Sequence, residues 1–132
     1  MGKIEKTGYE GKQDKIRDLK VTPELEVVEN QYADKDYIVE LNTNEFTTVC
    51  PKTGLPDFAT ITIAYKPKKY LVEQKALKLY LNGYRNIGIF QEHATNKVFE
   101  DFIDKVQPNW AKIEAVWNIR GGIGVKVVRE YE

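Results

Sequence analysis

Two runs of alternating apolar and polar residues constrain the fold more than any other feature of this sequence. The first run covers residues 36–48, and the second covers residues 58–66 and is rich in β-branched side chains. The turn between them, PKTGLP, carries two prolines and a glycine. Alternation with period two is typical of half-buried strands, so the pattern predicts an antiparallel hairpin. Residues 42–44 predict a bend or bulge in the first strand, and Pro67 ends the second.

The middle of the chain changes to helical periodicity. Residues 73–84 repeat apolar residues three or four positions apart, and residues 91–106 do so more regularly before Pro108. The apolar stripe of the second segment consists of Ala94, Val98, Phe99, Phe102, Ile103 and Val106. The charged residues of this segment are expected to face water: Lys97, Glu100, Asp101, Asp104 and Lys105.

Period two returns in residues 110–119. One face of this predicted strand carries Ala111, Ile113, Ala115, Trp117 and Ile119. The tripeptide at 120–122, Arg-Gly-Gly, predicts a tight turn into a last strand that begins at Ile123. The order β-β-α-α-β-β therefore predicts an α+β fold, a four-stranded antiparallel sheet with both helices on one face. We expect partner chains to cover the other face and the open edges.

The length of 132 residues suits one domain, which we expect to span residues 23–132. Residues 1–22 lack sustained periodicity and predict a flexible N-terminal arm, whereas residues 24–30 predict a brief edge strand. No apolar run approaches the roughly 18 residues that cross a bilayer, and the N-terminus lacks the apolar core of a signal peptide. We therefore expect a cytoplasmic protein with no membrane partner.

The balance of charges and the small number of metal-ligating residues limit the functions that this chain can have. The 20 basic and 20 acidic residues give a formal net charge of zero, so no direct nucleic-acid partner is expected. One histidine and one cysteine provide no metal-ligand spacing. Seven acidic residues and one lysine lie in residues 24–45, and six basic residues and one glutamate lie in residues 65–85. Such charge runs indicate either solvated faces or, for the basic one, an anion site for cofactor phosphates.

Cys50 is the only cysteine, and it stands where the first strand meets the turn. Asp57 follows seven residues later. A thiol on a rigid turn with a carboxylic acid nearby fits a nucleophile and its proton donor. A lone cysteine in a soluble domain is more often a small buried apolar residue. Both interpretations stay open on this stretch alone.

Four segments, in this order and spacing, resemble a known family. They are CPKTGLPDFATI from Cys50, EQKALKLYLNGYRN from Glu73, IFQEHATNKVFEDF from Ile89 and IRGGIGVKV from Ile119. The family is the single-module form of the NADPH-dependent nitrile reductases that convert 7-cyano-7-deazaguanine (preQ0) to 7-aminomethyl-7-deazaguanine (preQ1) in queuosine biosynthesis. The resemblance implies the tunnelling fold and NADPH as cofactor. It also implies a homo-oligomer, a decamer of two pentamers with active sites between subunits.

The resemblance implies a role for each matching position. Cys50 is expected to form a covalent thioimide with the nitrile carbon, and Asp57 to donate the proton. Glu92 is expected to anchor the deazapurine ring. Further substrate contacts are implied at Val72, Glu73, Gln74, Phe90 and Gln91. Cofactor contacts are implied at Lys75, Lys78, Arg120 and Gly121.

Two residues depart from the family pattern. Gln74 stands where the family has serine or leucine, and Gln91 stands where it usually has histidine, directly before Glu92. Glutamine can hydrogen-bond a substrate, but it does not titrate near neutral pH. His93 lies two residues further on, which places it on the opposite side of a helix from Gln91. We therefore expect His93 to be a surface residue.

Two other functions stay open at this point. One is a related transferase that forms a thioimide with preQ0 on tRNA and resolves it with an amine, as in archaeosine formation. The other is a non-catalytic purine- or pterin-binding module on the same fold, in which Cys50 would only pack. The NADPH-associated signature from Glu73 to Tyr80, in which only Gln74 departs, favours the reductase over the transferase.

Overall fold

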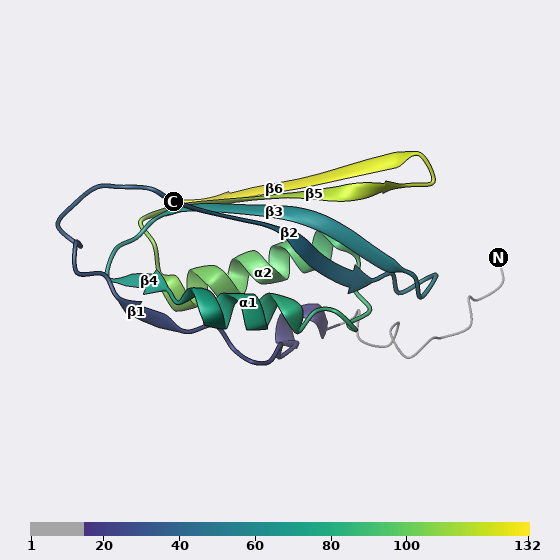
Figure 1. Ribbon diagram of the computed structural model, residues 1–132, viewed down its shortest axis with the longest axis horizontal. Helices are drawn as coiled ribbons and strands as arrows, with labels where there is room; N and C mark the ends of the chain where they lie inside the picture. The colour runs from purple at the N-terminus through teal and green to yellow at the C-terminus, as the bar shows by residue number, and fades with distance from the viewer. Residues whose placement is uncertain (1–14) are drawn as a thin grey trace.

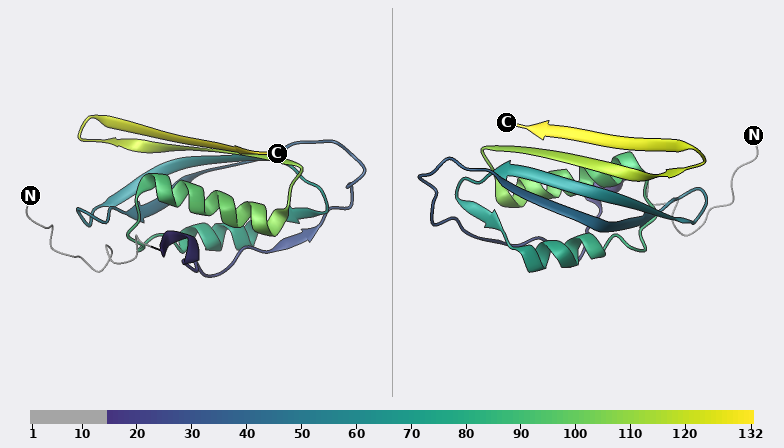
Figure 2. Two further views of the ribbon diagram at one scale, coloured as in Figure 1. Left: turned by 180° about the vertical axis from the view of Figure 1, so that it is seen from behind. Right: turned by 45° about the horizontal axis from the view of Figure 1, so that its top comes forward.

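A computed structural model describes residues 15–132, so residues 1–14 of the predicted arm lie outside the described residues (Figure 1). Its elements are β1 (Val27–Glu29), β2 (Val39–Val49), β3 (Pro56–Lys66), β4 (Tyr70–Val72), α1 (Gln74–Asn82), α2 (Gln91–Val106), β5 (Trp110–Arg120) and β6 (Ile123–Tyr131). The main sheet is antiparallel with strand order β2-β3-β5-β6. Both helices lie on one face of it (Figures 1 and 2), which confirms the predicted fold class.

The hairpin of β2 and β3 is paired as predicted. Val39 lies opposite Tyr65, and Val49 lies opposite Pro56. The register shifts between Thr43 and Phe46, because β2 contains one more residue than β3 over this stretch. This irregularity confirms the bend predicted at residues 42–44.

The core lies between the main sheet and α2. The apolar residues of β5 that face the helix are fully buried up to Trp117, and the α2 stripe is buried against them. Ring pairs join the layers, with centroids 5.0 Å apart for Tyr65 and Phe102 and 5.7 Å apart for Phe46 and Trp117. Ile119 was expected on the same face but is 72% exposed, because the β5–β6 hairpin extends past the helices (Figure 1).

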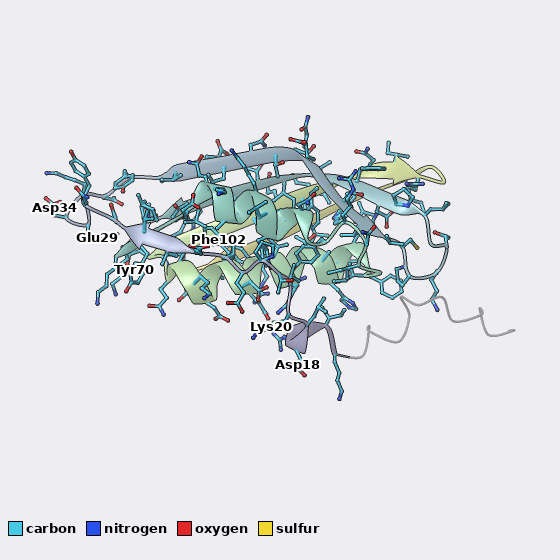
Figure 3. All side chains as sticks on the ribbon, turned by 60° about the horizontal axis from the view of Figure 1, so that its bottom comes forward. Asp18, Lys20, Glu29, Asp34, Tyr70 and Phe102 are labelled. Atoms are coloured by element: carbon cyan, nitrogen blue, oxygen red, sulfur yellow. The ribbon has the colours of Figure 1, made fainter. Side chains whose placement is uncertain are left out.

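The prediction that Lys97 faces water is wrong. Its side chain is buried, and Nζ donates to Asp101 Oδ1 at 3.0 Å and to the carbonyl of Arg17 at 3.2 Å. Residues 15–22, which the sequence placed in the arm, lie across the helices and bury Ile16 (Figure 3, near the labels Asp18 and Lys20). The spacing of apolar residues along the helix does not reveal a tertiary contact of this kind.

A second, two-stranded sheet was not predicted in full. β1 lies within the predicted edge strand and pairs with β4, with Val27 opposite Val72. β4 has three residues, too few to show a period. The main chain then enters α1 at Glu73, whose carboxylate caps the helix by accepting from the N–H groups of Lys75 at 2.7 Å and Ala76 at 3.1 Å. Within residues 15–132 no helix is long and apolar enough to cross a membrane.

Candidate active site

Cys50 lies directly after β2, on a backbone that is held from two sides. Val49 exchanges two hydrogen bonds of 3.0 Å with the main chain of residues 87–89. On the turn side, the N–H of Cys50 donates to the carbonyl of Leu55 at 2.8 Å, and its carbonyl accepts from Gly54 at 2.9 Å. Gly54 has φ of 73°, which favours glycine at this position. The thiol therefore sits on a well-defined turn.

Opposing effects act on the thiol of Cys50. Burial acts to raise its pKa, but hydrogen bonds from the Thr53 hydroxyl and from the backbone N–H groups of Thr53 and Lys52 outweigh burial. The Asp57 carboxylate also acts to raise it. The net pKa of Cys50 lies below the ordinary value of a cysteine, which favours the nucleophilic thiolate. Sequence reasoning missed Thr53 and Lys52, since the sequence does not show which groups of the turn approach the sulfur.

Asp57 faces the helix-covered side at the start of β3. Asp57 is only 9% exposed, and burial raises the pKa of its carboxyl. Arg120 Nε lies 3.7 Å from Asp57 Oδ1 and partly offsets this effect, yet the net pKa of Asp57 remains raised. The Thr47 hydroxyl donates to the Asp57 carbonyl at 2.8 Å and holds its main chain. A raised pKa is what a carboxylic proton donor needs.

Thr48 lies directly opposite Asp57 in the β2–β3 ladder. The residue is fully buried, and its Oγ1 has no hydrogen-bond partner among residues 15–132. An unsatisfied buried hydroxyl costs about 1–3 kcal/mol, and such groups are uncommon in proteins. Nothing in the sequence singled out this residue, because a threonine in a strand is ordinary.

The start of α2 lies close to the thiol because residues 87–89 pair with the end of β2. Phe90 is the N-cap of the helix, Gln91 is half-buried, and Glu92 is an exposed carboxylate of the first turn. His93 is exposed, as predicted, and its ring meets the ring of Phe90 edge to face at 5.8 Å. An acidic residue in the first turn is favoured by the helix dipole, so this position suits both helix stability and a ligand contact.

The turn between β5 and β6 lies at the same end of the molecule as the β2–β3 turn (Figure 1). It carries Arg120, which reaches Asp57, and then Gly121 and Gly122, with φ of 57° and 79°. No atom lies within 4 Å of where a Cβ would be at either glycine, so the main chain there is open to a ligand. A guanidinium beside open backbone is chemistry that fits the phosphates of NADPH.

The other predicted site residues lie at the opposite end. The N–H of Val72 donates to the hydroxyl of Tyr65 at 3.2 Å. Tyr65 is eight residues along β3 from Asp57, a distance of about 26 Å for an extended strand. Figure 3 shows Tyr70, of the same strand as Val72, at this far end with Glu29. Within one chain, Val72, Glu73 and Gln74 are therefore not brought to Cys50.

Lys75 and Lys78 also lie away from the thiol, on the exposed side of α1. Lys78 and Gln74 border an open groove of about 510 Å³ between α1 and the β2 edge. The floor of this groove is apolar and includes Leu41, Phe46, Ile61 and Leu77. Cys50 and Asp57 are not part of the groove. Within residues 15–132, no three His, Cys, Asp or Glu residues lie close enough to hold a metal ion.

Comparison with known proteins gives a consistent result. A family model described as QueF-like protein matches residues 56–132. A protein of Syntrophus aciditrophicus (strain SB), named NADPH-dependent 7-cyano-7-deazaguanine reductase, is 48% identical over 116 residues, which are 88% of this chain and 83% of that protein. A protein of the same name from Chloroherpeton thalassium (strain ATCC 35110 / GB-78) is 52% identical over 108 residues, which are 82% of this chain and 93% of that protein.

A solved structure supports the fold. The crystal structure of the archaeosine synthase QueF-Like in the apo form matches with a TM-score of 0.66 and 25% sequence identity. The match covers 70% of this chain and 91% of that chain. The tunnelling fold predicted from the sequence is thereby confirmed.

Replacing Thr53 by valine is expected to raise the pKa of Cys50, because the hydroxyl donor to the sulfur is lost. Alkylation by iodoacetamide near neutral pH should slow about two- to tenfold, the effect of a hydrogen bond of about 0.5–1.5 kcal/mol. The rate at high pH, where the thiol is fully ionised in both proteins, should be unchanged. Thr53→Ser, which keeps the hydroxyl, is the matched control. Equal alkylation rates of Thr53→Val and the unchanged protein at every pH would contradict this assignment.

Asp57→Asn is expected to be more stable than the unchanged protein at neutral pH. Because the folded-state pKa of Asp57 is raised, the folded protein binds this proton more tightly than the unfolded chain. The unchanged protein should then lose stability as the pH rises from about 4, the ordinary carboxyl value, through the raised pKa. Melting temperatures measured across this range should show a gap that widens in favour of Asp57→Asn and then levels. A gap that stays constant would show that the carboxyl is not perturbed.

Proposed function

Since the chain belongs to the QueF-like protein family, we propose that it reduces the nitrile of preQ0 to the aminomethyl group of preQ1, with NADPH as reductant. The product then serves queuosine biosynthesis. One observation carries the proposal. Cys50, a thiol with a lowered pKa, and Asp57, a carboxyl with a raised pKa, lie at the same end of the fold, close enough for the Asp57 carboxylate to act on the thiol. The relatives that share about half of their residues with this chain are named for the same reaction.

The reaction begins at the Cys50 thiolate. Its sulfur bonds to the nitrile carbon, and an electron pair of the carbon–nitrogen triple bond moves to nitrogen. Asp57 gives this nitrogen its proton and becomes a carboxylate, which completes a thioimide on the protein. Arg120, 3.7 Å away, then stabilises the new negative charge on Asp57.

NADPH, when bound, would supply the two hydrides that reduce the thioimide and then the imine left when the thiol departs, and each hydride addition would be completed by a proton to nitrogen. Arg120 and the open main chain at Gly121 are the groups nearest to Cys50 that suit its phosphates. Lys75 and Lys78 are exposed cations on α1 that lie away from Cys50, so they would serve the same cofactor as point charges only from a neighbouring copy. None of these residues lies in a Rossmann glycine motif.

The start of α2 holds the base. A carboxylate accepts two parallel N–H bonds, and the amidine edge of a deazaguanine offers two donors, so Glu92 is the anchor. Phe90 and Gln91 contact the same base next to the thiol. Gln91 contributes a hydrogen bond only, because its amide does not titrate near neutral pH.

The predicted site residues lie at two opposite ends of the molecule, and this separation favours a homo-oligomer. Val72, Glu73 and Gln74 complete a substrate site only if a second copy brings its far end to Cys50 of the first. A head-to-tail contact of this kind, repeated, closes into a ring. We infer a decamer of two pentamers, whose interfaces cover the exposed apolar residues Val116 and Val128 of the open sheet face. The protein is proposed to act in the cytoplasm on a free base, without a nucleic-acid or membrane partner.

The transferase of archaeosine formation is not favoured. The archaeosine synthase structure shares 25% of its aligned residues with this chain, whereas the reductases share 47–52%. A non-catalytic purine- or pterin-binding module would not need the hydrogen bonds that lower the pKa of Cys50.

The first test mixes the protein with preQ0 and NADPH and follows the absorbance of the reduced nicotinamide. Two NADPH should be oxidised for each preQ1 formed, and mass spectrometry without NADPH should show a preQ0 adduct on Cys50. Cys50→Ala should lose the adduct and roughly 10⁴-fold or more of the rate, as expected when a nucleophile is removed. Cys50→Ser serves as a control for shape. A well-folded protein that oxidises no NADPH with preQ0 would refute the proposal.

The second test concerns the shared site. Cys50→Ala and Glu73→Gln are each expected to be inactive, while Glu73→Gln keeps an oxygen that can cap α1. Mixing the two unfolded variants in equal amounts and refolding them together should restore about a quarter of the activity, because that fraction of sites combines an intact copy from each side. Light scattering should give about 153 kDa, ten times the chain mass of 15.3 kDa. No recovery on mixing would place both residues in one copy.

A further inference from the structure

Thr48 stands out among the buried polar residues of the described chain. Its Oγ1 is the one buried side-chain oxygen or nitrogen within residues 15–132 that lacks a hydrogen-bond partner. The hydroxyls of the buried Thr95 and the half-buried Thr47 do have partners. The hydroxyl of Thr95 donates to the carbonyl of Gln91 and accepts from Trp117 Nε1. An unsatisfied group in an otherwise satisfied core calls for a functional explanation.

The register places this hydroxyl beside the proton donor. Thr48 and Asp57 are direct cross-strand partners, so their side chains point to the same face with Cβ atoms about 4.5–5.5 Å apart. Both residues are buried on the helix-covered side. The charged and titratable groups that act on this pair are Arg120 from β5 and Cys50 at the end of β2.

Arg120 does not by itself satisfy the Asp57 carboxyl. At 3.7 Å, the Nε–Oδ1 separation is an ion pair and too long for a hydrogen bond. A carboxylic acid needs an acceptor for its proton, and a carboxylate needs donors. A hydroxyl provides one donor and two acceptor sites on a group that rotates freely, so it can serve both states in turn.

From this register and the unpartnered hydroxyl we infer that Thr48 is a positioning residue that hydrogen-bonds the Asp57 carboxyl as it gives up its proton. The inference rests on the proposed function. When the Asp57 O–H bond breaks and the N–H bond of the thioimide forms, the O–H electron pair remains on the carboxylate. A small rotation of the Asp57 carboxylate then brings that oxygen within reach of the Thr48 hydroxyl, which donates to it, while Arg120 balances the charge from further away.

A purely structural residue would be valine at this position. Valine has the same branched shape, suits a strand and carries no hydroxyl to bury. Retaining the hydroxyl therefore makes the resting protein less stable than a valine would. That cost is expected only if the hydroxyl finds a partner during turnover.

The test compares Thr48→Val with Thr48→Ser and the unchanged protein. Thr48→Val should melt at the same or a higher temperature, yet form the preQ0 thioimide about tenfold more slowly in a single turnover, a change of about 1.4 kcal/mol in the barrier. Thr48→Ser should recover the rate to within about twofold. Carbon NMR of labelled aspartate, with the Asp57 signal assigned through Asp57→Asn, should show a higher pKa of Asp57 in Thr48→Val.

Thr95→Val is the matched control for stability, because it removes a satisfied buried hydroxyl and should lower the melting temperature. If Thr48→Val does not fold, Thr48→Ala takes its place as the variant without the hydroxyl and is compared with Thr48→Ser. Unchanged thioimide formation and unchanged Asp57 titration in Thr48→Val would overturn the inference, as would a Thr48→Ser variant that is equally slow. If the unchanged protein forms no thioimide, the proposed function itself fails. That outcome differs from the two that would overturn only the role of Thr48.

Discussion

The main-chain pairing of Val49 with residues 87–89 is the contact on which the candidate site depends. Two hydrogen bonds of 3.0 Å join the end of β2 to the segment that leads into α2. The pairing fixes the thiol of Cys50 relative to the first turn that carries Glu92, although about forty residues separate them in the chain. Ile89, which is fully buried, anchors the segment in the core beneath. Without this pairing, the main chain would not hold the proposed nucleophile and the proposed base anchor in a fixed position relative to each other.

The same end of the fold shifts two titratable groups in opposite directions by different means. Cys50 receives hydrogen bonds from a turn of the main chain and from Thr53, which favour its charged form. Asp57 lies seven residues later but inside the sheet, where burial favours its neutral form. The two shifts move the pKa of the thiol and the pKa of the carboxyl toward each other, the direction that addition to a nitrile requires. Arg120 limits the shift of Asp57, so the carboxyl can still release its proton.

The sequence predicted the parts of this arrangement that depend on period and on turn chemistry. The bounds of α2, Gln91–Val106, agree with the apolar stripe, and the register shift in β2 lies between Thr43 and Phe46, overlapping the predicted bend at residues 42–44. The parts that depend on contacts between distant segments could not be predicted. Lys97 is buried by residues 15–22, and β4 exists only because β1 lies beside it. The backbone donors to Cys50 and the unpartnered hydroxyl of Thr48 could not be predicted either, since neither changes the residue type expected in a turn or a strand.

Glu73 illustrates how one residue can serve the fold and a neighbouring site. Its two carboxylate oxygens each accept one N–H from the first turn of α1, which stabilises the helix and fixes the side chain. A carboxylate has about four acceptor positions, so two remain for a ligand. Because the helix itself holds the rotamer, little conformational entropy is lost when a base binds. The cap and the proposed substrate contact are therefore compatible, and the helix cap already fixes the side chain of Glu73 for the site proposed between two copies.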